Sequence, residues 1–130
     1  MEPEVIGAAP SLANQVCEEL LCEQYWHNGS LSAPFNVIYL KFGLVWHRLT
    51  FDSGIIFWRQ QTERPTPYTM PELSAETRID NLGERTGLRG QRLVSYIAHA
   101  LDDGSGVVFS FEGDRTLVFR NIADQTSCVI

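Results

Sequence analysis

Three histidines are the first candidates for chemistry in this chain, because imidazole binds metals and acts as a general base near neutral pH. They are His27, His47 and His99. No two of them show the HxH, HxxxH or HExxH spacing that would bring two imidazoles to one ion. The dipole of a predicted helix accounts for His27 at its end, and His47 on an apolar strand face is typical of a hydrogen-bonded core residue. The pattern therefore predicts no metal site and no cofactor.

Carboxylates and nucleophiles give no clear catalytic site either. Asp52 and the pair Asp102-Asp103 stand in predicted turns, where acidic residues usually serve backbone geometry. Such turns could bind a cation if they met at one end of a sheet, although the DxDxDG order of a calcium loop is absent. No GxSxG nucleophile elbow occurs. This absence of catalytic signatures favours a function that is not enzymatic.

The cysteines indicate a reducing environment rather than a disulfide framework. Their number is odd and none forms a CxxC pair, so we interpret them as small buried hydrophobic residues. They are Cys17, Cys22 and Cys128. The first residues carry acids and no Lys or Arg, unlike a secretory signal, and no apolar window approaches ~20 residues. These features predict a cytoplasmic protein that neither enters nor binds a membrane.

A cluster of arginines is a candidate anion site. Arg85, Arg89 and Arg92 lie within one short segment, and guanidinium groups favour bidentate contacts with carboxylate or phosphate. The surrounding GERTGLRG sequence lacks the order of a phosphate-binding loop. The alternative is internal pairing of these arginines with Glu84, Glu76 or the acidic N-terminal region.

Aromatic and histidine side chains suggest a second kind of site, an apolar pocket for a small ligand on a curved sheet. The alternative is that these aromatic side chains only fill the core between a sheet and a helix. The candidate pocket residues are Trp46, His47, Phe57, Tyr96 and His99.

An amphipathic helix is predicted over residues 11–27, because apolar residues recur at helical spacing after the N-cap candidate Ser11. Glu18, Glu19 and Glu23 lie outside or at the edge of the apolar stripe and would form an acidic face. The chain has a net charge of -6, which opposes nucleic-acid binding and favours a basic protein partner.

The rest of the chain predicts antiparallel strands. Alternating apolar residues separated by Gly and Asp turns indicate two meanders of three strands each. The predicted strands are 35–42, 45–52, 55–60, 92–101, 107–112 and 115–121, with a short edge strand after Ala123. Residues 1–9 are expected to form a loose arm, and 61–91 a Pro/Gly-rich connection.

These elements predict a single α+β domain spanning residues 1–130. One N-terminal helix would pack on a twisted, mainly antiparallel sheet of about six strands. The favoured function is a protein-interaction module, such as an acidic inhibitor or immunity-type protein that binds a basic partner. A sheet cup for an apolar ligand and a structural homo-oligomeric subunit are the alternatives.

Overall fold

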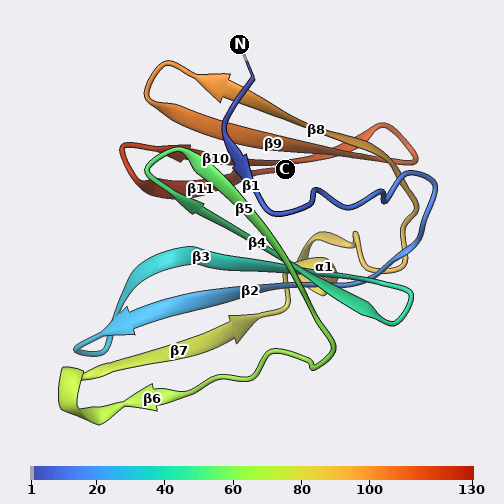
Figure 1. The fold of residues 1–130 in the computed structure, drawn as a ribbon. Helices are drawn as coiled ribbons and strands as arrows, with labels where there is room; N and C mark the ends of the chain where they lie inside the picture. Colours follow the sequence, from blue (N-terminus) through green and yellow to red (C-terminus); the bar gives the residue numbers. More distant parts are fainter. Residues whose placement is uncertain (1) are drawn as a thin grey trace.

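A computed structural model describes residues 2–130, and strands in two stacked sheets account for most of them (Figure 1). The elements are β1 (Val5–Ile6), β2 (Cys17–His27), β3 (Ser30–Phe42), β4 (Val45–Asp52), β5 (Ile55–Gln61), β6 (Thr69–Met70), a 3-10 turn (Pro71–Leu73), β7 (Ala75–Asp80), α1 (Leu82–Thr86), β8 (Leu93–Leu101), β9 (Gly104–Phe111), β10 (Arg115–Ile122) and β11 (Gln125–Val129).

The larger sheet has the strand order β1-β5-β4-β3-β2-β7-β6, and the smaller sheet has the order β11-β10-β9-β8. All neighbouring strands are antiparallel except β1 and β5. In Figure 1 the orange and red strands of the smaller sheet lie above β2, β3 and β7 of the larger sheet. Buried side chains of both sheets join one hydrophobic cluster, so the two sheets pack face to face as a sandwich.

The helix predicted over residues 11–27 is wrong, because Cys17–His27 forms strand β2 between β3 and β7. Leu20 and Leu21 are both fully buried, in clusters on opposite faces of the strand. A strand that buries both faces produces a short continuous apolar run, whose period cannot distinguish it from a helix. Asn14 also has a left-handed φ of 66°, which interrupts a helix. The α+β prediction is therefore corrected to a mostly-β fold with one helix of five residues among those described.

The two predicted meanders exist as strands, but they belong to different sheets rather than one. The first becomes β3, β4 and β5, and the second becomes β8, β9 and β10, with β11 as the edge strand. The connection 61–91 adds β6, β7 and α1. Within the predicted N-terminal arm, Val5–Ile6 forms β1 and pairs with β5, while Met1 lies outside the described residues.

Aromatic rings form the centre of the sandwich core. The ring of Phe109 stacks on Tyr96 at a centroid distance of 5.5 Å and meets Phe119 edge-on at 6.2 Å. Tyr96 also contacts Trp58 of the larger sheet at 5.6 Å, and Phe119 contacts Phe35 of the larger sheet at 6.0 Å. This chain of rings ties the two sheets together, because aromatic pairs in these geometries add to simple area burial.

A second, smaller cluster lies on the other face of the larger sheet and comprises Leu21, Val37, Tyr39 and Trp46. The proline-rich segment between β5 and β6 passes this cluster. Arg64 lies over the Trp46 ring at 5.8 Å. It also forms a salt bridge with Glu19. This outer cluster explains why Leu21 of β2 is buried on the face that turns away from the smaller sheet.

The turn between β4 and β5 docks against the start of β9. Gly54 lies so close to Gly104 that a Cβ on Gly54 would be 3.1 Å from the Cα of Gly104. A Cβ on Gly104 would itself be 1.7 Å from the backbone oxygen of Asn121. Three backbone segments thus meet where only glycine fits, and this junction places the β10–β11 hairpin beside the larger sheet.

Candidate functional site

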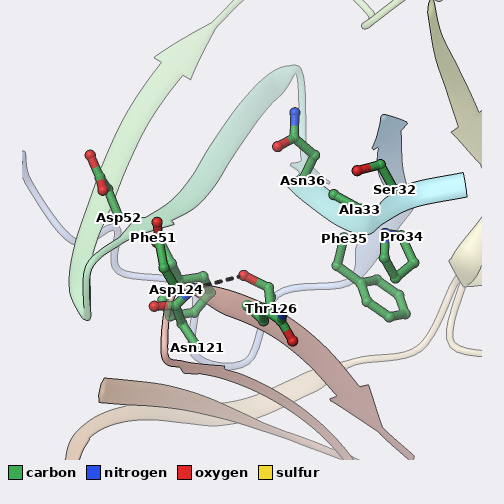
Figure 2. A pocket seen from close by; sticks show the side chains of 11 residues that line it. Ser32, Ala33, Pro34, Phe35, Asn36, Phe51, Asp52, Asn121, Asp124 and Thr126 are labelled. Atoms are coloured by element: carbon green, nitrogen blue, oxygen red, sulfur yellow. Dashed lines mark hydrogen bonds between the residues drawn. The ribbon is translucent and has the colours of Figure 1, made fainter. Parts of the chain in front are cut away.

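A cleft with a volume of about 580 Å³ opens between the larger sheet and the β10–β11 hairpin. Figure 2 shows side chains from β3, from the end of β4 and from the hairpin around this space. Its lining residues are Ser32, Ala33, Pro34, Phe35, Asn36, Phe51, Asp52, Asn121, Asp124, Gln125 and Thr126.

The hairpin side of the cleft is held by side chains that bind a neighbouring turn. Asn121 is only 1% exposed, and its Oδ1 accepts a hydrogen bond of 3.1 Å from the Gly54 backbone N–H. Its Nδ2 donates to the hydroxyl of Thr126 at 3.1 Å, the bond drawn in Figure 2. Asp124 Oδ1 accepts from the Ser53 N–H at 2.9 Å. The two hydrogen bonds to Ser53 and Gly54, called the latch below, therefore hold the β4–β5 turn against the β10–β11 hairpin. They fix one wall of the cleft.

The opposite wall comes from the start of β3. Asn36 Nδ2 donates to Glu23 Oε2 at 2.9 Å, so its amide oxygen stays available as an acceptor. Phe35 packs edge-on against Phe119, which anchors the wall in the sandwich core. Irregular pairing between β2 and β3 near Tyr25 locally interrupts the ladder. Such bulges bend a strand and re-aim its side chains.

The polar side chains of this cleft are mainly hydrogen-bond acceptors. Asp52 and Asp124 supply two carboxylates, and the amides and hydroxyls add neutral acceptors. None of the lining residues is Lys, Arg, His or Cys, so the lining itself has no cationic group and no nucleophile with an adjacent imidazole. This arrangement is suited to accept hydrogen bonds from a cationic group.

The predicted acidic face does not form one surface. Glu19 pairs with Arg64, whereas Glu23 is only 6% exposed and accepts the hydrogen bond from Asn36. Glu18 alone of the three is exposed. Residues two or four positions apart in a strand share a face, so Glu19 and Glu23 lie on the same side of β2, where each binds a different partner.

The three arginines of the predicted anion site contact other parts of the chain. Arg85 binds Asp80 through two bonds of 2.7 and 3.3 Å, and this hydrogen bonding raises the Arg85 pKa. Arg89 pairs with Glu84 at 2.7 Å. Arg92 donates to the backbone oxygen of Asn14. The structure thus places each guanidinium against its own acceptor.

The structure distributes the five predicted pocket residues over different faces. Tyr96 lies in the aromatic core, whereas Trp46 belongs to the cluster on the opposite face of the larger sheet. His47 is buried near the ring of Phe42. By register, Phe57 points to the same side as Trp46, and His99 points outward from the smaller sheet.

The cysteines carry thiols that are protonated at neutral pH. Burial raises the Cys17 pKa to about 12 and the Cys128 pKa to about 11, and it raises the Cys22 pKa well above the ordinary value. Because the thiolate is the reactive form, these residues act as core and boundary side chains in the folded chain.

His47 predicts a pH dependence of stability. Burial lowers its pKa from the ordinary value of 6.5, so between the folded and unfolded pKa values the unfolded chain binds more protons. The free energy of unfolding should therefore rise with pH through this window, up to about pH 6.5, and fall as the solution is acidified. Urea titrations at several pH values measure this slope. His47→Gln should flatten it, and an unchanged slope in that variant would contradict the assignment.

No external resemblance assigns a role to the cleft. Among residues 2–130, no group of three His, Cys, Asp or Glu side chains is placed to hold a metal ion. No helix in this part of the chain is long and apolar enough to cross a membrane. Comparison of the chain with known protein families, with curated proteins and with solved structures finds no match.

Proposed function

We propose that this chain is a non-enzymatic protein-interaction module that binds a basic segment of a partner protein in the cleft beside the β10–β11 hairpin. The observation that supports the proposal is the charge of the lining, whose only ionisable side chains are the carboxylates of Asp52 and Asp124. A Lys or Arg side chain entering the cleft would pair with these carboxylates. Charge-assisted hydrogen bonds of this kind are stronger than bonds between neutral groups.

The shape and surroundings of the cleft support the same partner. Its volume of about 580 Å³ is within the range of small-ligand pockets. Phe35 and Phe51 give the lining an apolar part, against which the methylene groups of Lys or Arg would pack. The net charge of -6 would also attract a basic partner at long range. The cleft replaces the acidic helix face that the sequence predicted.

A peptide titration tests the proposal. The probe is acetyl-Gly-Arg-Gly-amide, added to the 15N-labelled full chain at low salt. We expect amide shifts concentrated at Ser53, Gly54 and Thr126, which lie at the latched turns. The double variant Asp52→Asn and Asp124→Asn should weaken binding about fivefold, from the usual strength of exposed charge pairs. Asparagine keeps an oxygen acceptor for the Ser53 N–H, so the latch survives.

Two controls separate the cleft from general charge attraction. Asp102→Asn with Asp103→Asn removes the same charge from an exposed turn of the smaller sheet and should leave binding unchanged. The neutral peptide acetyl-Gly-citrulline-Gly-amide should not shift the turn amides. Equal binding of both peptides, or equal weakening by both double variants, would reject the proposal.

A further inference from the structure

Two arginines stand directly opposite each other on the face of the larger sheet that turns away from the smaller sheet. The register of β4 and β5 pairs Arg48 with Arg59. Residues directly opposite in antiparallel strands have Cβ atoms about 5 Å apart, and like charges in such a pair repel each other. An anion between the two guanidinium groups would relieve this repulsion.

No salt bridge among the described residues supplies that anion. Within residues 2–130, the salt bridges use Arg64, Arg78, Arg85 and Arg89 but neither Arg48 nor Arg59. The nearest neighbour of Arg48 on β3 is Tyr39, whose phenol stays neutral because burial raises its pKa.

Arg48 also carries an unsatisfied donor. Its Nε is buried and has no hydrogen-bond partner. A buried donor without a partner is costly, and the cost is greater for a charged group. Such an atom in a folded protein calls for a ligand, a water or an ion. Repulsion and the unsatisfied donor therefore indicate the same missing group.

The two arginines border a pocket of about 280 Å³, which is lined by Arg48, Thr50, Asp52, Phe57 and Arg59. Thr50 and Phe57 form the adjacent cross-strand pair. The hydroxyl of Thr50 is a donor for an oxyanion, and the Phe57 ring provides an apolar wall. Asp52 contributes one negative charge at the border between this pocket and the cleft.

We propose that this pocket binds the carboxylate of a small organic acid. Two guanidinium groups and the Asp52 carboxylate leave one positive charge, which a monoanionic carboxylate neutralises. A phosphate monoester carries a charge of about -1.5 to -2 at neutral pH, so its binding would leave the pocket with a net negative charge. The planar fork of each guanidinium matches a carboxylate through paired N–H···O bonds. The apolar body of the acid would lie against Phe57.

Calorimetric titration of the full chain with benzoate tests this site, with benzamide and inorganic phosphate as comparison probes. Benzoate should bind, benzamide should not bind, and phosphate should bind more weakly than benzoate. Arg59→Gln should weaken benzoate binding at least about tenfold, which corresponds to the loss of one charge-assisted hydrogen bond. Tighter binding of phosphate, or equal affinity of the wild type and Arg59→Gln for benzoate, would overturn the proposal.

Matched variants keep this test independent of folding. Arg120→Gln removes the same charge from an exposed position of the smaller sheet and should leave benzoate affinity unchanged. Arg59 is exposed, and its replacement relieves repulsion, so ligand-free Arg59→Gln should melt at or above the wild-type temperature. A lower melting temperature would mean that the chain itself already compensates this charge, and it would contradict the inference.

Discussion

Replacing Phe109 by alanine is expected to lower the free energy of unfolding by about 3–5 kcal/mol, the usual cost of removing a buried aromatic ring. Phe109 is fully buried, and its ring contacts Tyr96 and Phe119 at the centre of the sandwich. Backbone hydrogen bonds hold β9 between β8 and β10, so the surrounding strands cannot move together to fill the cavity. Urea unfolding followed by tryptophan fluorescence measures the loss.

Ile97→Ala is the matched control for Phe109→Ala. Ile97 lies on β8 of the same sheet, but its side chain faces outward and is 66% exposed, so its replacement should change stability by less than about 0.5 kcal/mol. A loss below about 1 kcal/mol for Phe109→Ala, or two separate unfolding transitions in the wild type, would show that the two sheets do not share one core.

The strands were predictable where one face is buried and the turns are short. Ser53-Gly54 and Gly113-Asp114 have positive φ values, as two-residue hairpin turns require, and the predicted strands beside them agree with β4, β5, β9 and β10 to within a few residues. β2 was not predictable in this way, because apolar residues on both of its faces erase the period-2 pattern.

The separation into two sheets depends on contacts that no local pattern encodes. Strand β5 pairs with the N-terminal Val5–Ile6 and not with β8, which belongs to the other sheet. Only long-range packing decides between these two pairings. Ala75–Asp80 alternates small or apolar residues with charged ones, which fits a strand, but its small residues make the signal weak. This segment forms strand β7, which is stabilised by its backbone pairing with β2.

The candidate sites differ in how far the sequence could indicate them. Asn121 and Asp124 look like ordinary strand-end and turn residues, so the cleft depends on the tertiary contact between two hairpins. The arginine pair was within reach of sequence analysis. A two-residue turn at Ser53-Gly54 fixes the register of its strands and places Arg48 opposite Arg59.

Gly104→Ala should destabilise the fold by about 3 kcal/mol, at the upper end of the range for overpacked sites. The new Cβ would be 1.7 Å from the Asn121 backbone oxygen, and backbone atoms of a paired strand cannot move aside without breaking ladder hydrogen bonds. Because Asn121 also binds the Gly54 N–H, the displacement would reach the cleft. Denaturant unfolding measures the stability, and amide shifts at Ser53 and Gly54 measure the displaced latch.

Gly113→Ala separates this steric effect from the general cost of replacing a turn glycine. No atom lies within 4 Å of a Cβ built on Gly113, whose φ is +76°. The only expected penalty is the left-handed backbone conformation, about 1–2 kcal/mol, without any shift at Ser53 or Gly54. Equal stability losses in the two variants, or unchanged latch amides in Gly104→Ala, would show that β9 and β10 do not meet closely at Gly104, and that the cleft wall is held in another way.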